Sequence, residues 1–150
     1  MSKITIMYVE DSFEETEIMK LFCKQYADKV KLLTFPDGVE FLNFIEKEDR
    51  EKISGPICIL LDIDLPFLNG LQILQRLKEN HNPTVRALPV VMYSSSTREQ
   101  DKQASQALGA SAHIEKPLTG EGTKTVLDFL IVNTLQLTEE LDLNNFAGER

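Results

Sequence analysis

Residues 57–62 read Ile-Cys-Ile-Leu-Leu-Asp, the most apolar run of the chain, and the run ends abruptly at Asp62. A short, continuous apolar run stopped by an acid is typical of a strand buried on both faces of a parallel sheet. Segments on either side of it carry apolar residues at the spacing of one helix face. The run is therefore predicted to be a strand of an α/β fold.

The rest of the chain repeats this alternation of strand and helix. The predicted strands are 4–9, 30–35, 57–61, 89–93 and 112–114. Helices are predicted over 12–28 and from about 123 to 137, with three more around Phe41, Ile73 and Ala104. Five apolar strands alternating with five amphipathic helices predict one doubly wound parallel sheet that is covered on both faces.

Composition and charge narrow the class of protein. The 150 residues suit one domain, and 42% hydrophobic with 27% charged residues exclude a disordered chain. The net charge of −8 argues against nucleic acid as a ligand. No apolar run approaches the roughly 20 residues that span a membrane. With no signal peptide pattern and with Cys23 and Cys58 expected as buried free thiols, we expect a cytoplasmic protein.

Polar residues gather where the predicted strands end. The carboxyl ends of parallel strands lie at one edge of the sheet, which is where α/β proteins bind ligands. Carboxylates, one hydroxyl and one ammonium follow four of the strands: Glu10, Asp11, Asp62, Asp64, Ser94 and Lys116. A single acid of this kind could simply cap a helix, but the whole set predicts a common site.

These side chains suit one kind of chemistry. Carboxylates packed closely repel one another, and a hard divalent cation such as Mg²⁺ relieves the repulsion with oxygen ligands. A free carboxylate beside that cation can attack phosphorus and become an aspartyl phosphate. An ammonium and a hydroxyl then stabilise the phosphoryl oxygens. The set therefore predicts phosphoryl transfer to a carboxylate.

The chain resembles the receiver domains of two-component response regulators over residues 3 to about 137. The residues that carry the resemblance are Val9-Glu10-Asp11, residues 60–66 with Asn69-Gly70, Pro89 to Ser94, and Gly109-Ala110 through Lys116-Pro117. The resemblance implies a flavodoxin-like, five-stranded parallel sheet in the order 2-1-3-4-5. It places the receiver domain in residues 1–137 and leaves 138–150 as an acidic tail, which we expect to be disordered.

The resemblance also implies a role for each site residue. Asp62 matches the phosphoacceptor, Ser94 the switch hydroxyl, and Lys116 the lysine that binds the phosphoryl group. Glu10 and Asp11 match the acidic pair that holds Mg²⁺, with Mn²⁺ as a substitute. Asp11 would be a direct ligand and Glu10 would act through water, while Asp62 itself and the backbone carbonyl of Asp64 complete the metal site. A cis peptide bond before Pro117 is implied as well.

Some positions depart from the family pattern or are specific to this chain. His113 stands where a switch Tyr or Phe is usual, and Ser95 replaces a smaller residue beside Ser94. The loop 80–88 is long, which resembles small receivers that work with phytochrome-type histidine kinases. The side chains of Asp64 and Ser96 should lie beside the path of attacking water, so we expect them to affect the lifetime of the phosphoryl group.

The expected function is that of a single-domain response regulator. It would accept a phosphoryl group from a sensor histidine kinase or a phosphotransfer protein and switch its binding to a downstream protein, without turning over an independent substrate. The last predicted helix carries two apolar stripes, headed by Val126 and Leu127. One stripe should pack on the sheet, and the other either widens the buried face or forms a partner or homodimer surface.

Three other functions fit parts of this pattern less well. A phosphatase of the haloacid dehalogenase type would use Asp62 and Asp64 as its Asp-x-Asp motif, but its nucleophile usually follows the first strand and its second acidic pair follows the lysine. A receiver-like module that never takes up phosphate would usually lack one of the site residues. A flavodoxin would need a Ser/Thr/Gly-rich loop after the first strand, and this chain has none.

Overall fold

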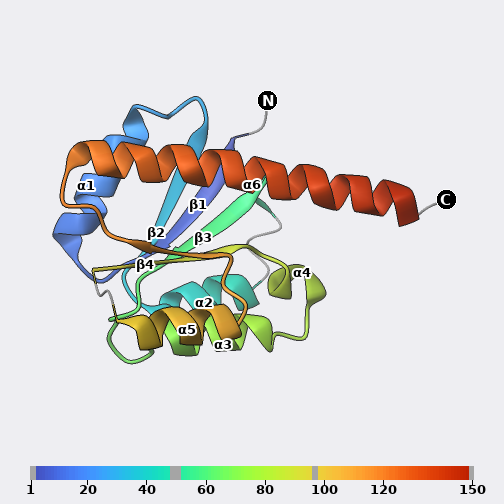
Figure 1. Cartoon of the computed structure of the whole chain (residues 1–150), viewed down its shortest axis with the longest axis horizontal. Coiled ribbons are helices and arrows are strands. Elements are labelled where there is room, and N and C mark those ends of the chain that lie inside the picture. Colours follow the sequence, from blue (N-terminus) through green and yellow to red (C-terminus); the bar gives the residue numbers. More distant parts are fainter. Residues whose placement is uncertain (1–2, 48–51, 96–97, 149–150) are drawn as a thin grey trace.

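The structure is a computed structural model that describes the backbone of residues 3–47, 52–95 and 98–148, and side chains as far as Gln136. Its strands are β1 (Ile4–Val9), β2 (Val30–Phe35), β3 (Ile57–Leu61), β4 (Val90–Ser94) and β5 (Ala112–Glu115). Its helices are α1 (Phe13–Lys24), α2 (Gly38–Glu46), α3 (Gly70–Lys78), α4 (Pro83–Arg86), α5 (Glu99–Ala107) and α6 (Gly120–Gly148). All the expected strands are present, and Figure 1 shows their alternation with the helices.

The five strands form one parallel sheet in the order β2-β1-β3-β4-β5, so the implied strand order is confirmed. The central pair, β1 and β3, is in register with Val9 opposite Leu61. On the other side of β3, Ser94 at the end of β4 stands opposite Glu115 of β5. The residues that follow β1, β3, β4 and β5 are therefore brought to one edge of the sheet.

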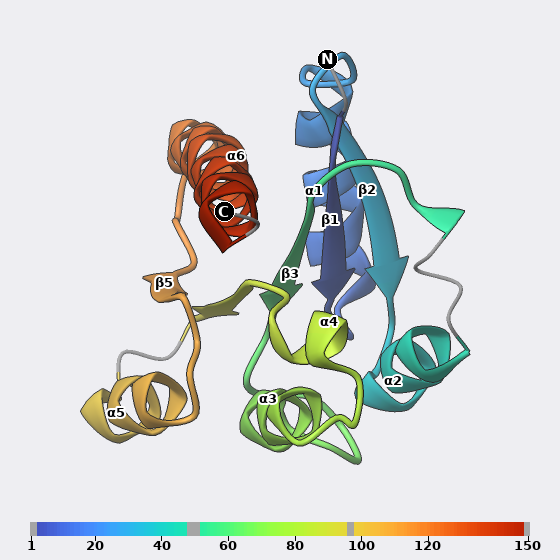
Figure 2. The same ribbon diagram turned by 90° about the vertical axis from the view of Figure 1, so that its right-hand side faces the viewer.

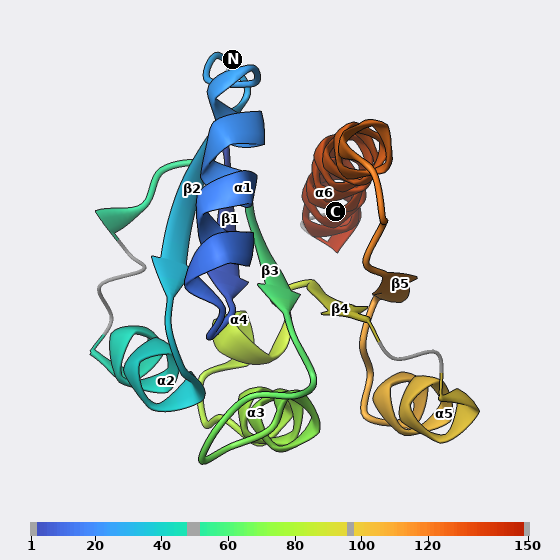
Figure 3. The ribbon, with the colours of Figure 1, turned by 90° about the vertical axis from the view of Figure 1, so that its left-hand side faces the viewer.

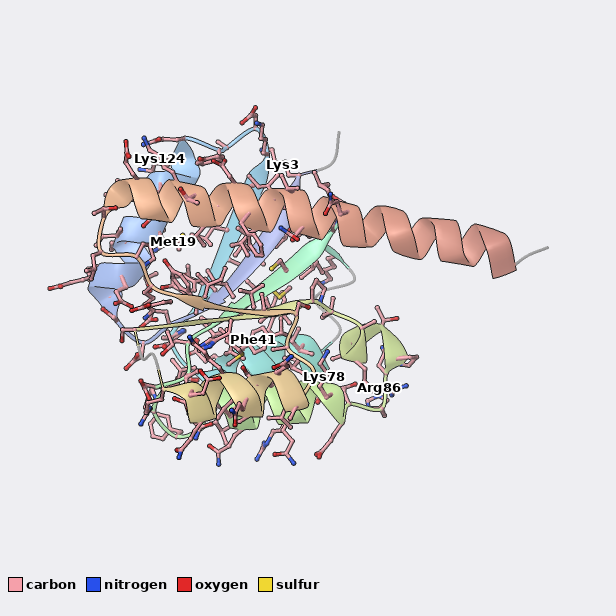
Figure 4. All side chains as sticks on the ribbon, in the orientation of Figure 1. Lys3, Met19, Phe41, Lys78, Arg86 and Lys124 are labelled. Carbon is pink, nitrogen blue, oxygen red and sulfur yellow. The ribbon has the colours of Figure 1, made fainter. Side chains whose placement is uncertain are left out.

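Helices cover both faces of the sheet, as Figures 2 and 3 show. On one face α1 and α6 pack against strand residues such as Ile6 and Tyr8. On the other face α2, α3 and α4 pack against their strand neighbours, such as Met7. Figure 4 shows Met19 and Phe41, both buried, on opposite sides of the sheet. Burial on both faces explains why the three inner strands, β1, β3 and β4, are mostly apolar without alternation, whereas the edge strands β2 and β5 are partly exposed and carry charged residues.

The helix α4 is an addition to the five predicted helices. It lies in the segment 80–88 that was predicted to be a loop. Asn82 caps it, with Oδ1 accepting a hydrogen bond from the Thr84 N–H at 2.9 Å, and Pro83 occupies the first turn, where a missing N–H costs nothing. Lys78 Nζ of α3 donates to the Arg86 carbonyl at 3.1 Å, which ties α4 to α3 (Figure 4).

The last helix is longer than predicted. It runs over Gly120–Gly148 and extends beyond the sheet in Figure 1, so the predicted bounds of 123 and 137 are corrected. A disordered acidic tail was expected from residue 138, but residues 138–147 contain neither Gly nor Pro, and nothing local ends the helix before Gly148. The division of the chain into a domain and a tail at residue 137 stays a prediction.

Both apolar stripes of α6 face the sheet. Val126, Leu127 and Leu130 are buried, and Ile131 and Leu135 pack against the same core. The second stripe therefore widens the buried face, which was one of the two expectations, while a partner surface on α6 stays a prediction. A homodimer through α6 stays a prediction. In the described part of the chain, no helix combines the length and hydropathy that crossing a bilayer requires.

Candidate functional site

Glu10 and Asp62 directly follow the neighbouring strands β1 and β3. The Glu10 N–H donates to the Phe35 carbonyl at 3.0 Å and the Asp62 N–H to the Val9 carbonyl at 3.2 Å, so the sheet holds both residues. Carboxylate oxygens of Glu10, Asp11 and Asp62 lie within 4.8 Å of one another. Glu10 and Asp62 are only 4% and 5% exposed, whereas Asp11 faces solvent. The structure thus brings together the three predicted acids.

The three carboxylates fit a hard divalent cation. Two of them are buried, so little water is left to screen their repulsion, and a cation would relieve it. Mg²⁺ prefers oxygen ligands and keeps several waters, for which the exposed side at Asp11 leaves access. The backbone carbonyl of Asp64 as a further ligand stays a prediction.

Lys116 approaches the acids from β5. Its N–H donates to the Ser94 carbonyl at 2.9 Å, which extends the β4–β5 pairing by one residue. Its side chain is 12% exposed, and Nζ lies 2.8 Å from Glu10 Oε2, 2.5 Å from Glu15 Oε2 and 3.6 Å from Asp62 Oδ2. One ammonium therefore faces three carboxylates.

Burial and these charges set the protonation of the site. Burial raises the pKa of the Glu10 and Asp62 carboxyls, and the Lys116 ammonium opposes that rise in both. Burial acts to lower the pKa of Lys116, but its hydrogen bonds to Glu10 and Glu15 outweigh burial, so the pKa rises. Lys116 is therefore an ammonium at neutral pH. A bound cation would favour the ionised carboxylates further.

Ser94 is fully buried at the end of β4. Because β4 lies between β3 and β5 in the sheet, Ser94 stands at the same edge as Asp62 and Lys116. This is the place that the sequence predicted for it.

His113 lies on β5 as predicted but away from the acids. It stands opposite Met92 and lines a cavity of about 280 Å³ beside α5, together with Lys102 and Ser105. Both ring nitrogens are buried, and neither has a hydrogen-bond partner among the described residues. Burial, reinforced by the Lys102 charge, lowers the pKa of the imidazole. A switch role for His113 stays a prediction.

Comparison with known protein families shows which family has this fold and these site residues. The family described as the response regulator receiver domain matches residues 6–128, a span that includes Glu10, Asp62, Ser94 and Lys116. The chain belongs to this family. It is a receiver domain of two-component signalling, as its sequence resemblance indicated.

The receiver domain has relatives among both sequences and structures. It is 30% identical to the response regulator Rcp1 of Synechocystis over 112 residues, which are 74% of this chain and 75% of Rcp1. The structure of Mn²⁺-bound Rcp1 matches with 26% identity and a TM-score of 0.70, over 84% of this chain and 90% of that one. The phosphorylated cyanobacterial phytochrome response regulator RcpA matches with 25% identity and a TM-score of 0.75, over 89% and 96%.

A further relative is a larger protein. The receiver domain is 31% identical to the protein-glutamate methylesterase/protein-glutamine glutaminase of Escherichia coli over 122 residues. These residues are 80% of this chain but 32% of that enzyme.

The Asp64 side chain makes a contact that the sequence did not indicate. It is 60% exposed, and its Oδ1 lies 3.4 Å from Nη2 of Arg98, whose Nε is 3.0 Å from Asp101. Arg98 directly precedes α5, so this pair joins the β3–α3 loop to the start of α5. No local pattern could reveal Arg98, because it is 34 residues from Asp64 in the chain. Ser96, predicted to act with Asp64, lies outside the described residues.

Glu15 is the other site residue of this receiver domain that the sequence did not indicate. The spacing of Ser12 and Glu15 is that of a capping box, in which the Glu15 carboxylate would accept from the Ser12 N–H. In the structure Ser12 Oγ does accept from the Glu15 N–H at 3.3 Å, but the Ser12 N–H donates to Glu10 Oε1 at 3.1 Å. The Glu15 carboxylate binds Lys116 instead, 101 residues away in the chain.

The peptide bond before Pro117 is trans, which corrects the cis bond that the resemblance implied; no cis peptide bond occurs among the described residues. Lys116 still reaches the acids. Its backbone is held by Ser94, and its four-carbon side chain spans the remaining distance.

Proposed function

We propose that this receiver domain accepts a phosphoryl group on Asp62 from a phosphohistidine and thereby switches its binding to a downstream protein. The donor would be a sensor histidine kinase or a phosphotransfer protein. The observation that carries the proposal is the position of Asp62, buried between two further carboxylates and the ammonium of Lys116.

Each group has a part in the proposed transfer. A carboxylate oxygen of Asp62 attacks phosphorus in line and forms the new P–O bond while the P–N bond of the phosphohistidine breaks. The electron pair of the P–N bond leaves with the histidine imidazole. Lys116 neutralises charge on the transferred oxygens, and the Ser94 hydroxyl donates to one of them. Glu10, Asp11 and Asp62 would hold Mg²⁺, or Mn²⁺ in its place, which supplies positive charge to the phosphoryl oxygens.

Exposed apolar side chains near this edge support a protein partner. Phe13 begins α1, Phe67 lies in the β3–α3 loop and Leu118 in the β5–α6 loop, and all three are largely exposed. Apolar side chains around a polar centre are typical of a surface that another protein covers. Because one related structure is a phytochrome response regulator, we propose a phytochrome-type histidine kinase as the donor.

The decisive experiment maps the phosphoryl group. The wild-type chain is incubated with acetyl phosphate and Mg²⁺, and the labelled residue is identified by mass spectrometry. We expect a label on Asp62, and Asp62→Asn should abolish it because an amide is a poor nucleophile. Asp37→Asn removes an equal charge at the start of α2 and should label normally. Equal labelling of the Asp62→Asn variant would end the proposal.

Lys116→Met tests how the phosphoryl group is sensed. The ammonium has a phosphoryl oxygen to bind in the phosphorylated state and none in the unphosphorylated state, so its contacts differ between the two states. We expect the variant to retain some labelling, while the gain in affinity for its partner on phosphorylation falls about tenfold. A gain identical to that of the wild type, measured by calorimetry with the cognate partner, would refute this role.

Turnover of a phosphomonoester distinguishes the phosphatase alternative from this proposal. A haloacid dehalogenase-like enzyme would hydrolyse a generic phosphomonoester with many turnovers, using Asp62 and Asp64. Here the acidic pair that joins Asp62 precedes it, at Glu10 and Asp11, as in the receiver family. We expect no repeated turnover of p-nitrophenyl phosphate.

A further inference from the structure

Glu15 is bound to the site without belonging to the metal cluster. Its Oε2 is 2.5 Å from Lys116 Nζ, closer than either Glu10 or Asp62. Among the described residues, the carboxylates close enough together to hold a cation are those of Glu10, Asp11 and Asp62, and Glu15 is not one of them. Glu15 lies on α1, so this contact ties the first turns of that helix to the residue after β5.

The partners of Lys116 conflict with its proposed task. An ammonium has three N–H donors, and here one is used by Glu10 and one by Glu15. Asp62 at 3.6 Å is beyond hydrogen-bond distance. A phosphoryl group on Asp62 would add three charged oxygens beside this ammonium. The one remaining N–H could bind only one of these oxygens, and the Glu15 carboxylate beside the ammonium would repel the others, so a second phosphoryl contact to Lys116 has to displace Glu15.

We propose that Glu15 is a positioning residue that holds Lys116 in the unphosphorylated state and releases it to the phosphoryl group. This inference rests on the proposed function. The exchange replaces one carboxylate partner of Lys116 by a phosphoryl oxygen, so it couples phosphorylation of Asp62 to helix α1. A cavity of about 140 Å³ between α1 and the segment after β5, lined by Glu15, Lys116 and Tyr93, gives Glu15 room to move.

A backbone N–H donor lies near the released Glu15 carboxylate. Ser12 already caps the Glu15 N–H, which is half of a capping box. The other half, the Ser12 N–H, is bound by Glu10 Oε1 at 3.1 Å. Glu15 can take over that N–H when it leaves Lys116. The two arrangements use the same donors with different acceptors, as a two-state switch requires.

Beryllofluoride, a stable mimic of the phosphoryl group, tests this exchange. Its affinity is measured by calorimetry at saturating Mg²⁺ for the wild-type chain and three variants. Glu15→Gln weakens the competing acceptor, so beryllofluoride should bind about threefold to tenfold more tightly. Glu15→Asp keeps the charge but is one methylene shorter, and it should behave like Glu15→Gln. Glu14→Gln removes a neighbouring, exposed charge on α1 and should match the wild type.

A second readout follows the amides of α1 by NMR. On addition of beryllofluoride, the Ser12 amide signal of the wild type should shift, and the shift should be much smaller in Glu15→Gln. Unchanged or weaker beryllofluoride binding by Glu15→Gln would overturn the proposal, as would a Glu15→Asp variant that matches the wild type. If the wild-type chain binds no beryllofluoride, the proposed function fails as well, whereas normal wild-type binding with an unaltered Glu15→Gln variant overturns this inference alone.

Discussion

The ion pair of Asp64 and Arg98 stands beside the residues proposed to carry the phosphoryl group. Asp64 is two residues beyond Asp62, and its side chain is largely exposed and 3.4 Å from Arg98. Asp64→Asn removes a negative charge near the proposed path of attacking water and loosens Arg98. We expect the autodephosphorylation rate to change severalfold, because an exposed pair contributes up to about 1 kcal/mol.

The measurement follows loss of the phosphoryl label with time, alongside a Mg²⁺ titration. Mg²⁺ affinity should stay nearly intact, because the Asp64 side chain is not in the carboxylate cluster. Glu99→Gln, which removes an exposed charge at the start of α5, is the control and should decay at the wild-type rate. Decay of Asp64→Asn at the parent rate, or a collapse of its metal affinity, would contradict the prediction.

The burial of the His113 imidazole leads us to expect that the stability of the fold depends on pH. Burial lowers the pKa of its imidazole from the unfolded value, and Lys102 on α5 adds to this while Asp101 and Glu99 oppose it. Below about pH 6.5 the unfolded chain therefore binds a proton that the folded chain resists. The free energy of unfolding thus falls as the pH drops below the unfolded pKa, and the loss is complete once the pH is below the lowered pKa of the folded chain.

Urea titrations between about pH 7.5 and 5.5 measure this loss. Replacing the imidazole in His113→Phe should flatten the pH dependence. An equal slope for the wild type and His113→Phe would contradict the prediction.

The junction of β3 and α3 depends on the absence of a side chain at Gly70. A Cβ built there would lie 2.2 Å from the Asp62 carbonyl oxygen and 2.8 Å from the Ile63 Cα. Both are backbone atoms, so they cannot move aside without displacing the proposed acceptor. Gly70→Ala should lower the free energy of unfolding by about 1–3 kcal/mol. It should also slow labelling of Asp62 by acetyl phosphate.

Gly120→Ala is the matched control at the start of α6. A Cβ there would meet the end of the Phe22 ring at 2.7 Å, and that half-buried side chain can turn away. We expect a smaller loss of stability and no effect on labelling. Urea denaturation and label incorporation compare the two variants directly. Equal effects of both substitutions would show that the β3–α3 junction is not specially constrained.

For the whole molecule, the carboxylate cluster predicts that Mg²⁺ stabilises the fold. An ion that binds only the folded state at about one hundred times its Kd contributes about 2.7 kcal/mol. For a chain of this size that raises Tm by roughly 5–10 °C. Chelation should reverse the gain. The double variant with Glu10→Gln and Asp11→Asn should abolish it, because two of the three clustered carboxylates are then neutral.

Thermal unfolding with and without Mg²⁺ measures this effect. The double variant without metal is expected to be at least as stable as the metal-free wild type, since repulsion among the acids is relieved. A Mg²⁺ response of the double variant equal to that of the wild type would contradict the assignment of the metal site.

Much of the architecture is visible in local sequence patterns. The short apolar runs of β1, β3 and β4 predict strands that are buried on both faces of a sheet. The parallel order of the strands then places Glu10, Asp62, Ser94 and Lys116 at one edge. Local signals also mark the Ser12 cap of α1. These patterns involve residues that are close together in the chain, so they can be recognised from the sequence before the fold is known.

Contacts between distant segments follow from the packing alone. The pairs of Glu15 with Lys116 and of Asp64 with Arg98 join residues 101 and 34 positions apart. Ser12 and Glu15 match a complete capping box by spacing, yet Glu10 binds the Ser12 N–H and Lys116 binds the Glu15 carboxylate once the fold brings Lys116 to the first turn of α1. Hydrogen-bond partners are settled by whichever acceptor the fold brings closest, and spacing along the chain does not record that choice.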